Sequence, residues 1–375
     1  MDLSLTEEQK IISSAAEKYF TENYSFDQRA KHLLDLGINP NKYWADFSKL
    51  GWLGLPFGED SGGLGGNVTD IMVLMEAFGK ALVIEPYILQ VIVVGKILES
   101  MAKNKIAKQH LSDLISGKKK FTFAFAETNY RFDLNVKGTV VKKIEEKYLV
   151  SGKKNFVIGL ENSDFIIFPA LNQENDSIML FSISKDLEGV NLNFYNSLGD
   201  IRAGDITFNK VELKKNMILG EYKVQDYLDN IEYIIDYATL AVCSDALGII
   251  DNMYEKTLDY AKTREQFGRK IGTFQVIQHK LVDIYIKKEE MRSLNYMAQL
   301  CIDKSPKERK KKISLNKIFL GTEAKKISQE CIQIFGGMGV ANEMDIGHFF
   351  KRLTVMCGIF GDVDFHLKRF ADNDA

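Results

Sequence analysis

Hydrophobic residues recur with two different periods along the chain, and the positions at which the period changes constrain the fold most. At the N-terminus, Thr6 and Gln9 have the spacing of a capping box, and the apolar residues that follow recur at helical spacing. Around Phe121, apolar residues begin to alternate with small or polar ones, as they do in half-buried strands. From about Val224 to the end of the chain, the helical period returns.

This order of patterns predicts an α+β protein with three consecutive domains. Residues 1–118 are expected to form an N-terminal α-helical domain, in which a glycine-rich break from Gly58 to Gly66 separates two helical regions. Residues 119–223 are expected to form a middle antiparallel β-barrel or sandwich, because short strands follow one another without intervening helices. Residues 224–375 are expected to form a C-terminal helical bundle. Within it, we interpret the lysine-rich stretch from Lys304 to Lys312 as a solvated connection between two helices.

Composition and charge exclude several classes of partner. Lysine and arginine total 49 and aspartate and glutamate total 51, so the net charge of −2 creates no general attraction to nucleic acid or anionic lipid. The most apolar stretch, from Ala81 to Leu98, is interrupted by Glu85, Pro86 and Lys96 and is too short to span a bilayer. The acidic start does not resemble a signal peptide, and the four cysteines lack metal-ligand spacing. We therefore expect a cytoplasmic protein that holds no metal and does not insert into a membrane.

The chain contains four local motifs. In the first third, Leu50 to Pro56 (LGWLGLP) leads into the glycine-rich turn. In the strand region, a strand ends in Phe125 to Thr128 (FAET), and Ser151 to Gly159 (SGKKNFVIG) follows after a hairpin. In the last third, Thr263 to Gln275 (TREQFGRKIGTFQ) joins two predicted helices. The fourth motif is Gln333 to Gly339 (QIFGGMG); no strand precedes its glycines, and their spacing differs from the dinucleotide-binding fingerprint, so we exclude a Rossmann site.

Together these motifs resemble the acyl-CoA dehydrogenase family, and the match covers nearly the whole chain. The resemblance implies an FAD-dependent enzyme that oxidises the α,β bond of an acyl-CoA thioester to a 2-enoyl-CoA. Fatty acid or steroid side-chain degradation is the pathway class that it suggests. It also implies an electron-transfer flavoprotein as the electron acceptor and a homo- or hetero-oligomer, either a dimer or a tetramer.

The resemblance places the FAD contacts in three of the motifs. Phe156 is expected to cover the flavin ring, and Arg264 is expected to pair with the pyrophosphate, whose charges suit a fixed guanidinium. The glycines after Gln333 are expected to let the backbone approach the FAD of a neighbouring subunit. The cofactor-binding residues implied in this way are Phe125, Ala126, Phe156, Ile158, Arg264, Gln266, Phe267, Gln275, Gln333, Gly336 and Gly337.

Four positions in this region depart from the family pattern. Phe156 replaces the usual tryptophan, and Ala126 and Ile158 replace the usual threonines. Phe132 falls where the family has a serine in the following loop. Contacts that the backbone makes to the flavin are expected to survive these changes, whereas contacts through side-chain hydroxyl groups are lost.

The carboxylate that serves the family as catalytic base is missing from both of its usual positions, which hold Phe360 and Ala238. Removal of the α-proton nevertheless needs a base. In one interpretation, Asp362 is a shifted catalytic base whose pKa is raised by apolar neighbours. In the second, the base lies on a partner, as the similarity to small subunits of pimeloyl-CoA and steroid side-chain dehydrogenases suggests. In the third, the chain is a non-catalytic flavin-binding scaffold or has moved to other flavin chemistry. Asp362 also suits the N-cap of a helix from Val363 to Phe370.

Overall fold

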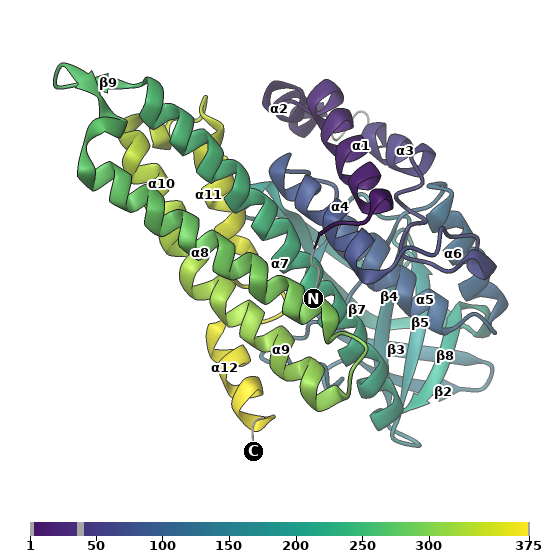
Figure 1. Ribbon diagram of the computed structural model, residues 1–375. Helices are drawn as coiled ribbons and strands as arrows, with labels where there is room; N and C mark the ends of the chain where they lie inside the picture. Colours follow the sequence, from purple (N-terminus) through teal and green to yellow (C-terminus); the bar gives the residue numbers. More distant parts are fainter. Residues whose placement is uncertain (1–3, 36–40, 374–375) are drawn as a thin grey trace. The chain divides into compact units, whose positions relative to one another are not determined.

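The computed structural model describes residues 4–35 and 41–373 of the chain (Figure 1). The chain forms two compact units, and each unit is assembled from segments that are separated in the sequence. The bundle unit comprises the described residues of segments 1–34, 68–83 and 239–375, and the sheet unit comprises those of segments 35–67 and 84–238. Helical first and last thirds enclose a strand-rich middle third in the sequence, so the predicted α+β architecture is confirmed.

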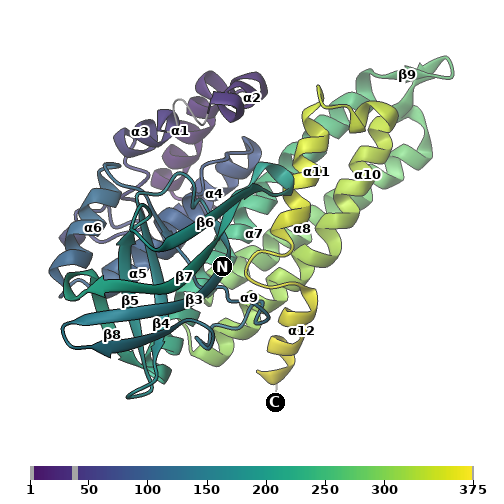
Figure 2. The same ribbon diagram turned by 180° about the vertical axis from the view of Figure 1, so that it is seen from behind.

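The sheet unit is built on one eight-stranded sheet, in which seven strands follow the order β6-β7-β3-β2-β4-β5-β8 and β1 pairs with β4 (Figure 2). Most neighbours are antiparallel, as predicted, but β4 runs parallel to both β1 and β2. Parallel neighbours need a longer connection, and the β2–β3 hairpin lies between β1 and β4 in the sequence. The strands are β1 Phe121–Phe123, β2 Val140–Ile144, β3 Lys147–Ile158, β4 Phe165–Asn172, β5 Ser177–Ser184, β6 Val190–Asn196, β7 Arg202–Lys214 and β8 Ile218–Lys223.

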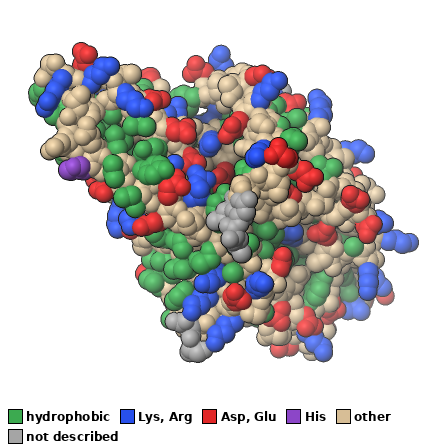
Figure 3. All heavy atoms as spheres, in the orientation of Figure 1, with side chains coloured by type: hydrophobic (Ala, Val, Ile, Leu, Met, Phe, Trp, Pro, Cys, Tyr) green, Lys and Arg blue, Asp and Glu red, His purple; other side chains and the backbone are tan. Residues whose placement is uncertain are grey.

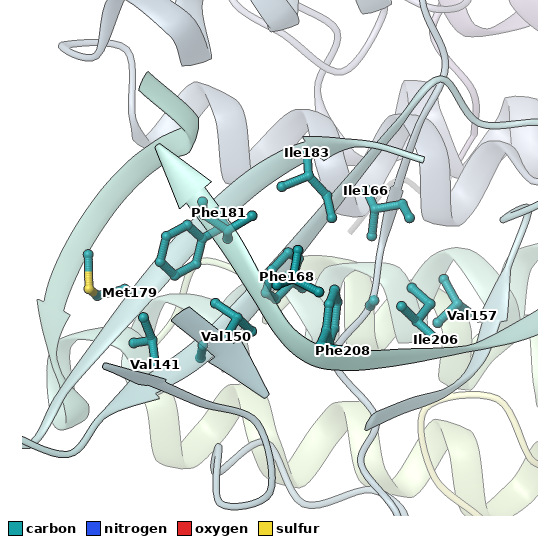
Figure 4. Close-up of a cluster of buried hydrophobic side chains, with 14 of the residues drawn as sticks. Val141, Val150, Val157, Ile166, Phe168, Met179, Phe181, Ile183, Ile206 and Phe208 are labelled. Atoms are coloured by element: carbon teal, nitrogen blue, oxygen red, sulfur yellow. The ribbon is translucent and has the colours of Figure 1, made fainter. Parts of the chain in front are cut away.

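Aromatic rings from three strands form the centre of the sheet unit's core (Figure 4). Phe168 stacks on Phe208 with ring centroids 4.5 Å apart and on Phe181 with centroids 5.6 Å apart. Smaller β-branched side chains such as Val150 and Ile206 fill the space around them. This core arises because every second residue of the strands points to the same face of the sheet.

Helices of the sheet unit flank the strands in the sequence. Asn104 caps α6 by accepting hydrogen bonds from the amides of Ile106 and Ala107 at 2.8 and 3.1 Å. The helix α7, Val224–Thr263, is long and apolar enough to cross a membrane by length and composition, but 89% of its most apolar window is buried, as in the core helix of a folded protein. The other helical elements are α3 Lys42–Lys49, the 3₁₀ turn η1 Glu59–Ser61, the π-helical η2 Ile88–Val93, α5 Val94–Ser100, α6 Lys105–Ile115 and the 3₁₀ turns η3 Leu198–Asp200 and η4 Lys215–Met217.

The bundle unit consists of helices, including the part of α7 that follows residue 238, and one short two-stranded hairpin (Figure 1). The predicted capping box is confirmed: Gln9 N donates to Thr6 Oγ1 at 3.2 Å, and Thr6 N donates to Gln9 Oε1 at 3.0 Å. The other elements are α1 Glu7–Asn23, α2 Phe26–Asp35, α4 Val68–Lys80, η5 Ile271–Thr273, α8 Gln275–Leu300, α9 Pro306–Phe319, η6 Leu320–Ala324, α10 Lys325–Phe335, η7 Gly336–Val340, α11 Asp345–Met356 and α12 Val363–Asp372.

The interpretation of Lys304 to Lys312 as a connection between helices is wrong for most of that stretch. The helix α9 begins at Pro306, and the Ser305 side chain caps it by accepting a hydrogen bond from Glu308 N at 3.4 Å. A proline in the first turn of a helix costs nothing, since its missing N–H has no partner in the helix. The lysines therefore continue a helix whose start is specified by serine and proline rather than by apolar residues.

Within the bundle unit, α4 and α7 approach each other closely at two glycines. A Cβ atom on Gly79 would lie 1.9 Å from Asp245 O, and one on Gly248 would lie 1.9 Å from Glu76 O. No side chain fits at such distances. These glycines therefore set the separation of the two helices.

Candidate functional site

The loop that follows β1 is tied to β3 by a buried ion pair. Lys154 Nζ donates to Glu127 Oε1 at 2.8 Å, and the same carboxylate accepts hydrogen bonds from the three consecutive amides of residues 137–139 at 2.6–2.9 Å. Burial lowers the pKa of Lys154 to about 8. Burial alone would raise the pKa of Glu127, but Lys154 and the amides hold it below the usual range. The pair fixes both ends of the loop.

Two backbone contacts bring the sequence-predicted residues of the two strand motifs together. Asn155 N donates to Ala126 O at 2.9 Å, and Thr122 Oγ1 donates to Ile158 O at 2.8 Å. Phe125 lies next to Ala126 and is half-buried, with its ring stacked on that of Phe123. Ala126 and Ile158 are also half-buried. The segments that contain Phe125, Ala126 and Ile158 therefore form one continuous part of the sheet unit.

Phe156 differs from its neighbours because its side chain is 41% exposed. Its φ angle is +51°, in the left-handed region that a phenylalanine rarely adopts. Its amide donates to Asp205 Oδ1 at 3.0 Å, and Tyr195 Oη donates to the same oxygen at 2.8 Å. An aromatic ring is thus presented on the surface of the unit by a backbone that is held in an unusual conformation.

In the bundle unit, the predicted helix junction ends in a hairpin. Arg264 follows α7 directly, and its carbonyl accepts a hydrogen bond from Ile271 N at 2.9 Å. Between them, β9 (Glu265–Gln266) pairs with β10 (Arg269–Lys270). Phe267 lies at the tip of this hairpin and is 92% exposed. The side chain of Arg264 is also exposed, and no carboxylate within residues 4–35 and 41–373 forms an ion pair with it.

A ring stack joins this junction to the glycine motif. The rings of Tyr260 and Phe335 lie 4.3 Å apart and within 13° of parallel, which connects the end of α7 to the end of α10. Gly336, with a φ angle of +65°, ends α10, and neither it nor Gly337 would bring an added Cβ atom within 4 Å of another group. Gln333 before them is exposed. Open space therefore lies in front of both glycines.

Two further residues of the predicted set, Gln266 and Gln275, are also exposed. Gln275 is the first residue of α8, whereas the Gln266 side chain donates to the carbonyl of Glu265. The structure thus gathers the predicted residues into two groups, one in each unit.

The segment between α11 and α12 contains both the position of the usual base and Asp362. Phe360 is buried and has a φ angle of +58°. The carboxylate of Asp362 accepts a hydrogen bond from Phe365 N at 3.0 Å and forms the N-cap of α12. The expectation that Asp362 caps the following helix is therefore confirmed.

Two buried side chains of α9 hold this segment. Lys317 Nζ donates to the carbonyls of Met356 and Cys357, at 2.7 and 2.9 Å, and so lies at the C-terminal end of α11, where a cation is favoured. Burial lowers the pKa of Lys317 to about 8. One helical turn earlier, Ser314 Oγ lies 3.2 Å from His366 Nδ1. The segment around Phe360 is thus anchored at both ends by α9.

Comparison with known proteins settles the family. The descriptions "Acyl-CoA dehydrogenase, N-terminal domain" and "Acyl-CoA dehydrogenase, C-terminal domain" match residues 6–118 and 228–373, respectively. The chain belongs to the acyl-CoA dehydrogenase family. Members of the acyl-CoA dehydrogenase family are FAD-dependent oxidoreductases that act on CH–CH bonds, so the predicted enzyme class and the predicted cofactor are confirmed.

Relatives of this acyl-CoA dehydrogenase family member cover nearly all of it. A subunit of the caffeyl-CoA reductase–Etf complex of Acetobacterium woodii is 26% identical over 93% of each chain. Among solved structures, a glutaryl-coenzyme A dehydrogenase bound to glutaryl-CoA has a TM-score of 0.88 at 18% identity, covering 100% of this chain and 96% of that one. The ChsE4-ChsE5 complex from Mycobacterium tuberculosis has a TM-score of 0.84 at 19% identity, covering 99% and 98%. At these identities the two structures show the fold.

The residues present in this family member fit FAD. The exposed guanidinium of Arg264, which no carboxylate of the described residues pairs with, suits the negative charges of a pyrophosphate. The open space before Gly336 and Gly337 lets a ligand approach the backbone. In the sheet unit, the exposed ring of Phe156 suits contact with a flat aromatic ligand.

Sequence reasoning missed the residues that support this set. It did not assign roles to Asp205, which binds the amide of Phe156, or to the buried cations Lys154 and Lys317. No local signal marked Lys154 as buried, because it lies between Lys153 and Asn155 in a polar part of β3. The partner itself, Glu127, lies 27 residues earlier and is found only from the fold.

Proposed function

We propose that this chain is an acyl-CoA dehydrogenase subunit that oxidises the α,β bond of an acyl-CoA thioester in a heteromeric enzyme, with the catalytic base on a partner subunit. The observation that carries this proposal is the hydrogen bond from Phe365 N to the Asp362 carboxylate, which commits Asp362 to capping α12. Phe360 and Ala238, at the two usual base positions, have no group that accepts a proton. A carboxylate from outside the chain then completes the site.

When bound, FAD supplies the acceptor for the hydride that leaves the β-carbon. The chain's own residues bind and orient the reactants. Phe156 covers the flavin ring, Arg264 neutralises the pyrophosphate, and backbone amides near Phe360 polarise the thioester carbonyl as the α-proton leaves. The anchoring of this segment by Lys317 supports the last role, because a preorganised amide stabilises developing charge without having to move.

Assembly with a second subunit is supported by exposed apolar side chains on the bundle unit. Figure 3 shows hydrophobic side chains gathered over α8, and large apolar residues that are exposed on this helix are Val276, Val282, Tyr285, Ile286 and Leu300. The exposed Phe267 and Gln333 further support a shared FAD site, in which each contacts the cofactor of a neighbouring subunit. We propose a dimer or tetramer that lies in the cytoplasm and passes electrons to an electron-transfer flavoprotein.

A second candidate is the same chemistry in the reverse direction. Two relatives, each 26% identical to this chain, are a caffeyl-CoA reductase–Etf complex subunit and a 3-(aryl)acrylate reductase. Reduction of a 2-enoyl thioester uses the same contacts, with the proton delivered to the α-carbon rather than removed from it.

Anaerobic flavin titration tests both directions. The chain is purified with FAD, and the flavin absorbance is followed after addition of an acyl-CoA, alone and with a co-expressed family member that contains the glutamate. We expect bleaching only with the partner. Reoxidation of the reduced flavin by a 2-enoyl-CoA that is faster than the forward step favours the reductase. Bleaching by the chain alone contradicts the heteromeric proposal, and no bleaching under any condition supports the scaffold interpretation.

A further inference from the structure

The backbone conformation of Phe156 results from a bulge in the sheet. Lys154 lies opposite Ile206, and Val157 lies opposite Gly204, so two residues of β3, Asn155 and Phe156, face the single residue Asp205 of β7. A bulge leaves the amide of its extra residue outside the ladder of hydrogen bonds and bends the strand. At this bulge, Phe156 adopts a φ angle of +51°. Such a conformation persists only where the surroundings stabilise it.

The stabilising group is the carboxylate of Asp205. Its Oδ1 atom accepts a hydrogen bond from Phe156 N at 3.0 Å and a second from Tyr195 Oη at 2.8 Å. Tyr195 belongs to β6, the edge strand beside β7, so the contact extends across three strands. Burial, followed by the bond to Asp205, raises the pKa of Tyr195 to about 12, in agreement with a protonated hydroxyl group that donates to the carboxylate.

The bulge also determines where the ring points. The side chains of Lys154 and Val157, on either side of the extra residues, are buried, whereas that of Phe156 is exposed. In a regular strand, residues two positions apart lie on the same face, so Phe156 would lie on the buried face together with Lys154. The amide of Phe156 is occupied by Asp205 and is not available to a ligand. The exposed ring is therefore the part of Phe156 that we expect to meet a ligand.

We propose that Asp205 and Tyr195 are positioning residues that hold Phe156 in the bulge and thereby aim its ring at the flavin. The inference rests on the proposed function, because it takes the flavin as the partner of the ring. A hydrogen bond to a charged acceptor is about twice as strong as a neutral one, which suits a site that must offset an unfavourable backbone angle. The variants Asp205→Asn and Tyr195→Phe weaken this support without changing the size of either side chain much.

Hydrogen exchange tests the positioning without using the flavin. In the full chain, with or without added FAD, exchange at the amide of Phe156 is expected to accelerate by at least about tenfold in Asp205→Ala, as for loss of one charge-assisted hydrogen bond. Asp205→Asn and Tyr195→Phe are expected to have smaller effects of the same sign. Matched controls are Glu212→Gln, which removes an exposed carboxylate from the same strand, and Tyr222→Phe on the opposite edge strand β8. Unchanged exchange in all three Asp205 and Tyr195 variants overturns the inference.

FAD affinity tests whether the effect reaches the cofactor through Phe156. Phe156→Ala is expected to weaken FAD binding about 2–10-fold, the range for loss of one ring contact. Asp205→Asn is expected to weaken it less, and the double variant is expected to match Phe156→Ala within about twofold. Single effects that multiply in the double variant overturn the positioning role. If exchange responds to Asp205 but no variant affects FAD binding, the proposed flavin contact of Phe156 fails instead, and with it the flavin part of the inference.

Discussion

The ammonium group of Lys154 lies 2.8 Å from the carboxylate of Glu127, and the two side chains are 0% and 2% exposed. When one partner of a buried ion pair is removed, the other charge stays buried without a counter-charge or solvent. The resulting loss of folding free energy is much larger than the difference in stability between an intact ion pair and apolar residues in its place. The Glu127 carboxylate also accepts the amides of residues 137–139. The pair is therefore the connection on which the loop after β1 depends.

We predict that Lys154→Met lowers the free energy of unfolding by about 3–5 kcal/mol, because Glu127 is left buried and unpaired. Urea unfolding followed by circular dichroism measures the change. The matched control is Lys147→Met in the same strand, whose ion pair with Glu212 is exposed to solvent and is expected to contribute little to stability. Equal losses in the two variants would contradict the assignment.

Local sequence signals predicted elements well where caps and periods agree. Thr6 and Gln9 identified the start of α1, and Asp362 identified the start of α12, because capping involves residues only three positions apart. The edge strands β6 and β8 were not predicted. In β6, Val190, Leu192 and Phe194 alternate with asparagines, so the period-two pattern of a half-buried strand was present there and was overlooked.

The candidate site was predicted less completely, because its contacts join residues that are far apart in the sequence. Motifs led to the assignment of Arg264 and Phe156 as cofactor contacts, which remains a prediction. They did not locate Asp205, which lies 49 residues from the amide that it binds, nor the stack of Tyr260 on Phe335. Contacts over such separations depend on the register of strands and the packing of helices, which no local pattern contains.

A second prediction concerns the buried imidazole of His366. Burial, with smaller contributions from Lys317 and Arg369, lowers its pKa to about 3, so the ring is neutral in the folded chain. An unfolded histidine has a pKa of about 6.5. The neutral ring therefore stabilises the fold above about pH 6.5, and this contribution is lost progressively as the pH falls toward 3.

The measurement compares wild type with His366→Gln by urea unfolding between pH 7 and 4. The substitution removes one side chain that takes up a proton when the chain unfolds. We therefore expect the pH slope of the unfolding free energy to fall by up to about 1.4 kcal/mol per pH unit. His279→Gln, at an exposed position on α8, is the control. If the unfolding free energies of wild type and His366→Gln vary in parallel with pH, His366 does not bind a proton on unfolding.

A third prediction concerns the contact between α4 and α7. In Gly248→Ala the new Cβ atom would lie 1.9 Å from Glu76 O, so the helices must separate, and we expect a loss of about 1–3 kcal/mol in unfolding free energy. Gly58→Ala is the control, because no atom lies within 4 Å of its added Cβ. Thermal unfolding of both variants decides the matter, and a Gly248→Ala protein as stable as wild type would refute the close approach.

A fourth prediction concerns the cation at Arg264. If the exposed guanidinium pairs with the FAD pyrophosphate, Arg264→Ala weakens FAD binding by at least about tenfold. Flavin content after purification and a fluorescence titration with FAD give the change. Lys270→Ala removes an exposed cation of the same hairpin and is expected to have little effect. Equal losses in both variants would indicate a general charge effect rather than a specific contact.

The last prediction separates the two proposed locations of the base, at Asp362 or on a partner. Asparagine is about as good an N-cap as aspartate, so Asp362→Asn keeps the cap of α12, whereas Asp362→Ala loses it and is expected to destabilise the chain by about 0.5–2 kcal/mol. Asp362→Asn therefore removes the carboxylate with little structural disturbance. If the base lies on a partner, the assembled Asp362→Asn enzyme reduces its flavin at the wild-type rate under anaerobic stopped flow. If Asp362 is the base, the rate falls by about 10²–10⁴-fold, as for loss of a general base. We expect the first result, because the Asp362 carboxylate is already engaged by Phe365 N.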